Sequence, residues 1–333
     1  MTILYAATSL SDCVARDVSY TVVSTTTAKL GPYVPEGCQM NYVNNSGGAD
    51  TPDLTFDVPA MTEGWVSFYL DFSDFTANNW HHNVFAFRNK AETTIPLFRV
   101  HKPMNSSSLV FYRSQGSSQF STAMVYPTLA LHRFDINFKL HATTGFVYIY
   151  MDGTLWHTYE GPLYSAASGL MNQITFQREG GNSTIVRTMS ALFMADEDTR
   201  AMHLTMDYPT ANGTYGEWVG DYTNVNGQGV DDTDYISTDL TGMKESFTFP
   251  AVNAALSLFE IKAAILSTSS DYLTRGAKGF TRVGSTNYDN GQFIFNNNVG
   301  KGKNSIFNTN PATGLAWTLA ELEAAEFGLE STE

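Results

Sequence analysis

Residues 133–140 read RFDINFKL, so that every second side chain in this stretch is apolar. Successive side chains of an extended chain point to opposite faces, so the apolar set shares one face. The alternation therefore predicts an antiparallel strand with one side buried and the other side polar. Residues 65–72 show the same alternation, with apolar residues at positions 66, 68, 70 and 72. The members of the first apolar set are Phe134, Ile136, Phe138 and Leu140.

An Asp152-Gly153 pair separates two further apolar runs, at residues 146–151 and 155–157. Asp-Gly between such runs predicts a two-residue hairpin, because glycine accepts the positive φ of the turn. Many short strands joined by turns are typical of a β-sandwich. The other short strands that we expect in this part of the chain are residues 83–88, 97–101, 109–113, 173–177, 184–187 and 189–194.

The composition changes after about residue 195. Residues 195–229 are polar and rich in turn formers, among them Pro209 and two Asn-Gly pairs. We expect a domain boundary near Asp207, which gives one domain at residues 1–205 and a second at residues 206–333. The predicted fold class is all-β, with two β-sandwich (jelly-roll) domains in tandem and a short C-terminal helix. The weaker strand candidates of the second domain are residues 246–249, 259–267, 280–283, 292–295 and 306–307.

The C-terminal helix is predicted from capping signals. Thr318 stands three residues before Glu321, which is the spacing of a capping box, and Trp317 can pack on Leu322 as a hydrophobic staple. With Gly328 as a stop, the predicted helix covers residues 319–327. A helix of about nine residues is unstable alone in water, so we expect it to contact a sandwich or a neighbouring subunit. The residues expected on its buried side, and hence as assembly-interface candidates, are Trp317, Leu322 and Phe327.

Composition and charge exclude several classes of function. The net charge is −14, and no basic cluster is seen along the sequence. Such a chain repels phosphate backbones and anionic membrane surfaces, which disfavours nucleic-acid and membrane binding. No apolar run approaches the roughly 20 residues that span a bilayer, and we see no secretory signal. The low charged fraction of 16% and the aromatic fraction of 13% instead suit large polar interfaces in an assembly.

The sequence offers little for catalysis or metal binding. The Glu-x-Asp-x-x-Glu pattern that some sandwich glycosidases carry on one strand is absent, and the nearest carboxylates lie on the predicted helix. We therefore predict that the chain is not an enzyme and has no cofactor. Asp196 and Asp198 could hold calcium, although a solvated turn is the commoner explanation of such an acidic cluster. Cys13 and Cys38 are either two unpaired thiols or one disulfide.

Large aromatic side chains are the one feature compatible with a sugar ligand. Three of them stand beside polar residues near predicted strand ends, where exposed rings can stack on sugar faces. The alternative is ordinary packing in a core or an interface, which is the commoner role of such residues. The three candidates for glycan binding are Trp80, Tyr112 and Trp156.

Residues 133–204 resemble the concanavalin A-like lectin/glucanase jelly roll, which is also laminin-G-like. The stretch that carries this resemblance is VYIYMDGTL at residues 147–155. Several other segments resemble virion proteins of tailed bacteriophages, including the closing domain of phage tail-associated proteins. These segments are residues 189–200, Trp218, and residues 231–236, 310–318 and 326–328.

The resemblance implies an accessory role in a virion, in the tail, baseplate, collar or capsid surface. The partners would be other virion proteins and further copies of the chain, and assembly would take place in the host cytoplasm. The lectin residues that bind sugar and calcium find no position-by-position match. A module that binds host polysaccharide therefore remains the alternative function, and a glycoside hydrolase is disfavoured by the missing carboxylates.

Overall fold

The structure is a computed structural model of the chain. The chain divides into two compact units. One is Leu4–Thr205, and the other is Met206–Glu333 together with Met1–Ile3. We refer to them as the N-terminal unit and the C-terminal unit. The residues that the structure describes are 3–7, 15–16, 39–42, 52–72, 81–91, 96–103, 108–115, 118–125, 127–163, 169–179, 185–204, 207–226, 234–251, 265–268, 275–295 and 303–332.

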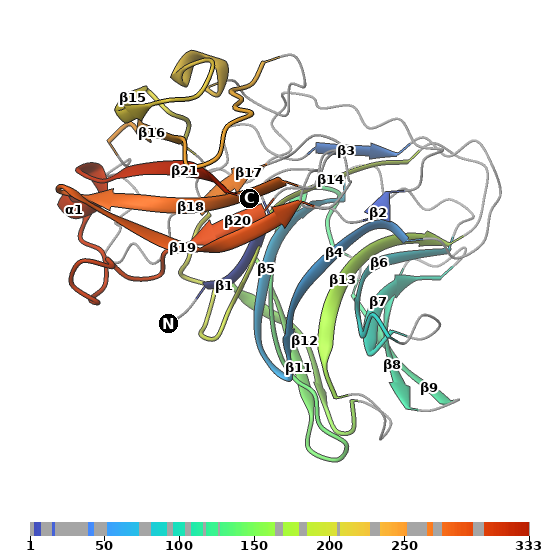
Figure 1. Cartoon of the computed structure of the whole chain (residues 1–333). Helices are drawn as coiled ribbons and strands as arrows, with labels where there is room; N and C mark the ends of the chain where they lie inside the picture. Colours follow the sequence, from blue (N-terminus) through green and yellow to red (C-terminus); the bar gives the residue numbers. More distant parts are fainter. Residues whose placement is uncertain are drawn as a thin grey trace. The chain divides into compact units, whose positions relative to one another are not determined.

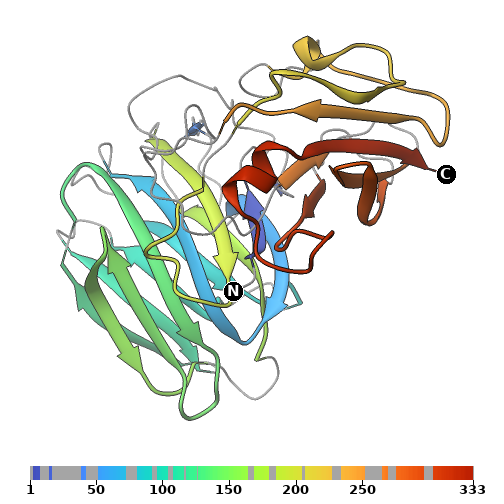
Figure 2. The ribbon, with the colours of Figure 1, turned by 90° about the vertical axis from the view of Figure 1, so that its left-hand side faces the viewer.

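Two seven-stranded sheets form the N-terminal unit (Figure 1). The first, named here the β10 sheet, has the order β1 (Ile3–Ala7), β14 (Ile185–Ala195), β5 (Glu63–Asp71), β10 (Leu131–Lys139), β11 (Phe146–Met151) and β12 (Thr154–Glu160), with β3 (Gln39–Tyr42) also paired to β14. The second, named the β7 sheet, has the order β2 (Ala15–Arg16), β4 (Pro52–Met61), β13 (Met171–Glu179), β6 (His81–Arg88), β7 (Phe98–Lys102), β8 (Leu109–Gln115) and β9 (Ser118–Met124). Figure 2 shows the green strands β10, β11 and β12 side by side, and both of their pairings are antiparallel.

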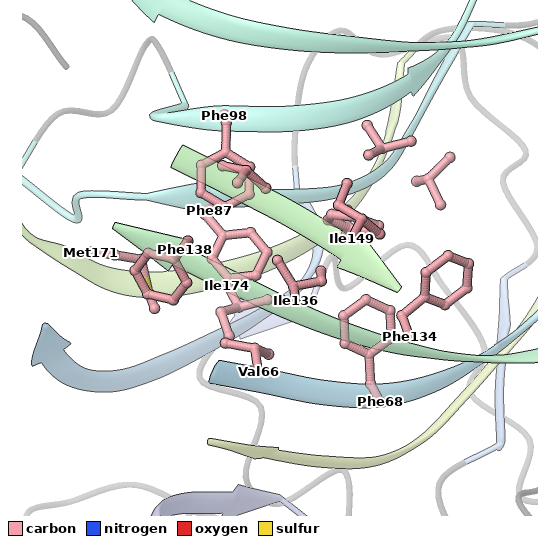
Figure 3. Packing of buried hydrophobic residues seen from close by; sticks show 14 of the residues in the cluster. Val66, Phe68, Phe87, Phe98, Phe134, Ile136, Phe138, Ile149, Met171 and Ile174 are labelled. Carbon is pink, nitrogen blue, oxygen red and sulfur yellow. The ribbon is translucent and has the colours of Figure 1, made fainter. Parts of the chain in front are cut away.

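The core lies between the two sheets and is built largely from phenylalanine (Figure 3). Phe134 on β10 stacks on Phe68 of β5 at 5.5 Å between ring centroids. Phe138 of the same strand meets Phe87 of β6, from the opposite sheet, at 5.6 Å. The predicted alternation is thus confirmed for the inner face of β10. Each such side chain stabilises the sandwich by about 1.5–3 kcal/mol when it leaves water.

The predicted hairpin is confirmed. Asp152 has φ 51° and Gly153 has φ 77°, the positive values of a primed two-residue turn between β11 and β12. Residues 184–187 and 189–194 are expected as separate strands, but residues 185–187 and 189–194 belong to the single strand β14, and residue 184 lies outside the described residues. A bulge interrupts its pairing with β5, and Ala191 within the bulge has φ 52°. The bulge lies within the second expected strand, whereas Thr188, at the gap between the two, pairs in register with Gln39 of β3.

The C-terminal unit is also built from strands. Its main sheet has the order β15 (Ala211–Gly216), β16 (Lys244–Thr248), β21 (Glu326–Thr332), β18 (Arg275–Val283) and β19 (Thr286–Phe295). A second sheet contains only β17 (Ile265–Thr268) and β20 (Lys303–Ile306). The helical elements described are the 3-10 turn η2 (Tyr222–Asn224) and the helix α1 (Leu319–Glu323). The predicted all-β class with one short C-terminal helix is confirmed for the part of the chain that the structure describes.

The predicted end of the helix is wrong, whereas its start is confirmed. Thr318 and Glu321 form the capping box, with each side chain accepting from the other residue's backbone N–H. The helix stops at Glu323, and Phe327 and Gly328 lie in β21, so that a strand and not a helix closes the chain. The strand is favoured because β21 pairs with both β16 and β18 and thereby satisfies its backbone groups. Gly328 is therefore a strand glycine and not a helix stop.

One charged side chain faces the core of the N-terminal unit. Lys102 lies on the same side of β7 as Phe98 and Val100 and is 1% exposed, and its Nζ has no hydrogen-bond partner among the described residues. Burial lowers the pKa of the Lys102 ammonium. A buried polar group without a partner costs stability.

We therefore expect Lys102→Met to stabilise the N-terminal unit by about 1–3 kcal/mol at neutral pH, measured by urea unfolding. Between the lowered pKa and the ordinary value of about 10.4, the unfolded wild-type chain binds more protons than the folded chain. Wild-type stability should rise with pH across that window, so the gain from the substitution should shrink there. Lys139→Met, on the outer face of β10, is the control and should change stability by less than about 0.5 kcal/mol. A destabilised Lys102→Met variant would contradict the placement of this lysine.

Candidate functional site

The outer face of the β7 sheet gathers basic and polar side chains. Arg99 of β7 pairs in register with Ala86 of β6 and Tyr112 of β8, so that the three side chains share one face. The Arg99 guanidinium lies over the Tyr112 ring, 5.0 Å from its centroid. The His101 ring meets the same tyrosine edge-on at 5.4 Å. The inner positions of these strands are phenylalanine and valine, so the alternation places the polar set outside.

A second row of polar side chains extends this face toward β13 and β4. Gln173 of β13 pairs in register with both Arg88 of β6 and Asp57 of β4. The Arg88 Nε donates to Thr175 Oγ1 at 3.2 Å, and Gln173 Nε2 donates to Asp57 Oδ1 at 3.0 Å. Lys90 forms an ion pair with the same aspartate. We name Arg88, Arg99, His101, Tyr112 and Gln173 together the basic face.

The charge of the basic face is opposite to that of the chain. Two guanidinium groups, at Arg88 and Arg99, belong to it, and Asp57 of the same row pairs with Lys90. Arg88 and His101 are buried, whereas Arg99, Tyr112 and Gln173 are partly exposed. Residues up to 85 positions apart in the chain come together there, which no sequence cluster could indicate. A local positive potential attracts anions, and a guanidinium binds carboxylates through two parallel hydrogen bonds.

The outer face of the β10 sheet differs, because a network of buried polar groups occupies it. Asp135 accepts from Arg133 Nε at 3.0 Å, from Arg133 Nη2 at 2.9 Å and from Thr199 Oγ1 at 2.7 Å. Arg133 also donates to the Thr199 carbonyl and to His203 Nδ1. Burial, and then the nearby guanidinium, lowers the pKa of His203. The sequence pattern predicted a solvated polar face here, and that is wrong for Arg133 and Asp135, which are buried.

Aromatic rings on the same outer face stack on one another. Trp65 and Tyr150 stack at 5.8 Å, and the Arg200 guanidinium lies 4.3 Å from the centroid of the tyrosine ring. Phe146 and Tyr148 stack at 4.8 Å with their planes 14° apart. Sugar recognition by aromatic residues needs an open ring face. These stacked rings are therefore not open to a sugar, and the Tyr112 ring of the β7 sheet has Arg99 over one of its faces.

The three glycan-binding candidates lie in different surroundings. Tyr112 lies on the basic face. Trp156 of β12 packs against the core, with its ring edge-on to Phe134 at 5.7 Å. Trp80 lies outside the described residues. Sequence reasoning missed Arg88, Arg99 and Gln173, although the polar positions of the alternating strands could have indicated them.

The calcium candidates are not arranged as a metal site. Asp198 forms a forked ion pair with Arg200, with both carboxylate oxygens 3.0 Å from the arginine Nε. This hydrogen bonding to Arg200 lowers the pKa of the Asp198 carboxyl. In the described part of the chain, no group of three or more His, Cys, Asp or Glu residues, Asp196 included, is placed to hold a metal ion. Cys13 and Cys38 lie outside the described residues.

The assembly-interface candidates lie in the core of the C-terminal unit. Trp317 and Phe327 are buried together with Phe307, and Leu322 packs against this cluster while remaining partly exposed. The Trp317 indole donates to the Phe307 carbonyl at 2.9 Å. Their contacts stabilise their own unit, and a role in assembly stays a prediction. Among the described residues, no helix is long and apolar enough to cross a membrane.

Comparison with known proteins gives structural similarity only. No family model and no curated protein matches the chain. An endo-beta-1,4-glucuronan lyase from Trichoderma reesei is 12% identical, with a TM-score of 0.44, and 59% of this chain and 96% of that chain are covered. The alginate lyase vAL-1 from Chlorella virus is 10% identical, with a TM-score of 0.37, and 54% of this chain and 90% of that chain are covered. The CBM2 module of the evolved Dit of Lactobacillus casei BL23 phage J-1 is 8% identical, with a TM-score of 0.34, and 58% of this chain and 94% of that chain are covered. At these TM-scores the similarities assign no activity to the chain.

Proposed function

We propose that the protein is a non-catalytic accessory component of a tailed-phage particle whose N-terminal unit binds acidic polysaccharide of the host surface. The basic face is the observation that carries the binding part of this proposal. The sequence segments that resemble virion proteins, at residues 189–200 and 310–318, support the location. An accessory structural role through protein–protein contacts is the part of the function that the C-terminal unit would supply.

The chemistry of the basic face favours a carboxylated glycan. The partly exposed guanidinium of Arg99 can form charge-assisted hydrogen bonds to a sugar carboxylate, and the buried guanidinium of Arg88 adds positive charge nearby. Tyr112 and Gln173 add hydroxyl and amide groups that can bond sugar hydroxyls. Because the whole chain is negative, a polyanion gains only from this local patch, and binding should weaken steeply as salt rises.

Arg99→Ala should weaken binding of the full chain to alginate by about 10-fold to 100-fold, because a hydrogen bond to a charged group contributes about 1.5–3 kcal/mol. Affinity is measured by isothermal titration calorimetry, with dextran as a neutral polymer that should not bind. Lys139→Ala is the matched control, since this lysine lies on the outer face of the other sheet and pairs with Glu63 at 3.0 Å. It should leave the affinity unchanged.

Three results would count against the proposal. Equal affinity of the Arg99→Ala and Lys139→Ala variants would remove the basic face as the binding site. No binding of alginate or of any other acidic polysaccharide tested would leave only the assembly role. A fall in alginate viscosity with time would show cleavage and overturn the non-catalytic part.

A further inference from the structure

A 27-residue excursion between β15 and β16 exposes large apolar side chains. It covers residues 217–243, and none of the residues described in it is buried. Val219 is 74% exposed, Tyr235 62% and Leu240 57%. Three such side chains in one short stretch of the C-terminal unit offer apolar surface to a partner, because apolar patches on a surface often mark interaction sites. We name these three residues the apolar tip.

Hydrogen bonds hold the backbone of the excursion in place. Val219 and Ser237 exchange two backbone bonds of 2.8 and 3.0 Å, which join the two arms of the excursion. The Trp218 backbone donates to the buried Glu245 carboxylate at 3.1 Å, and the Trp218 indole donates to the Met243 carbonyl at 3.1 Å. At the other end, Ser331 Oγ donates to the Leu240 carbonyl at 2.6 Å. The apolar tip is thus presented on an ordered backbone, so docking would cost little conformational entropy.

Every charged side chain described in the excursion is acidic. Residues 217–243 contain no lysine, arginine or histidine. The acidic residues described in the excursion are Glu217, Asp221, Asp234 and Asp239. Hydrogen bonds from Thr223 lower the pKa of the Asp221 carboxyl, which keeps it charged. A symmetric contact between two copies would place these acids against one another, which is unfavourable.

We propose that the described arms of the excursion, residues 217–226 and 234–243, are the docking surface for a different protein with a basic, partly apolar surface. This inference rests on the proposed virion role, so the partner is another protein of the particle. Its Lys and Arg side chains face the acids of the excursion, and an apolar pocket receives the apolar tip. Figure 1 shows the base of the excursion at strands β15 and β16 of the C-terminal unit.

A pair of matched triple variants tests this docking in the full chain. In the test variant, Val219, Tyr235 and Leu240 are each changed to Ser. In the control variant, three exposed apolar residues of the N-terminal unit are changed to Ser; they are Val125, Leu129 and Leu155. The amount of each chain in purified particles is measured, together with its circular dichroism and its affinity for alginate.

The test variant should enter particles at less than one tenth of the wild-type level, and the control variant at the wild-type level. Carbodiimide treatment of wild-type particles should join Glu217 or Asp239 to a lysine of another virion protein. Equal incorporation of the test variant, or cross-links only to a second copy of the chain, would overturn the proposal. Absence of the wild-type chain from particles would overturn it together with the virion role, whereas alginate binding by the purified chain would still stand.

Discussion

Replacing Asp135 by alanine is expected to destabilise the N-terminal unit by about 3–5 kcal/mol. The carboxylate accepts three hydrogen bonds, two from Arg133 and one from Thr199, and it is fully buried. Its removal leaves the buried guanidinium of Arg133 without its counter-charge. The same change also releases the Thr199 hydroxyl, which ties the segment after β14 to the outer face of the β10 sheet.

Asp198→Ala is the matched control for this substitution. Asp198 also pairs with an arginine, Arg200, but both side chains are partly exposed. Exposed ion pairs contribute about 0–1 kcal/mol, so this variant should unfold close to the wild type. Both are measured by urea unfolding followed by circular dichroism. A loss of less than about 1 kcal/mol for Asp135→Ala would contradict the buried network.

Gly328→Ala is expected to destabilise the C-terminal unit by about 3 kcal/mol, at the upper end of the cost of overpacking. A Cβ at this position would lie 2.2 Å from the Glu245 carbonyl oxygen and 2.6 Å from the Phe280 ring. The first of these atoms belongs to the backbone of the neighbouring strand and cannot move aside alone. The sheet of β16, β21 and β18 would therefore have to separate locally.

Gly216→Ala separates this close approach from the general effect of changing a strand glycine. Gly216 lies in β15, and a Cβ there would meet nothing within 4 Å. The free energy of unfolding of the Gly216→Ala variant should stay within about 0.5 kcal/mol of the wild-type value. Hydrogen exchange of β18 and β21 reports on the C-terminal unit separately. Unchanged protection of these strands in Gly328→Ala would contradict the packing described for β21.

The sequence predicts the local features of the fold that depend on near neighbours. The alternation around Phe134, the Asp152-Gly153 turn and the capping box at Thr318 all follow from residues within a few positions of one another. The end of the helix does not, because pairing of β21 with two distant strands outweighs the helical preference of residues 324–327. The burial of Asp135 also depends on a segment more than 60 residues away.

The candidate site is less predictable than the fold, for a related reason. Tyr112 could be selected from sequence because it is an aromatic residue near polar ones. Arg88, Arg99 and Gln173 become neighbours only through the strand order and register of the β7 sheet. Trp156 satisfies the same sequence criterion as Tyr112 but packs against the core. A single sequence specifies which side of a strand is polar, but not which strands lie next to each other.

Hydrogen–deuterium exchange of the full chain with and without saturating alginate tests the central claim most directly. Binding at the basic face should slow exchange in β6, β7 and β8, which carry Arg88, Arg99 and Tyr112. Exchange in β10 and in the strands of the C-terminal unit should not change. Protection confined to the β10 sheet or to the C-terminal unit, or no protection anywhere, would contradict the claim that the outer face of the β7 sheet binds acidic polysaccharide.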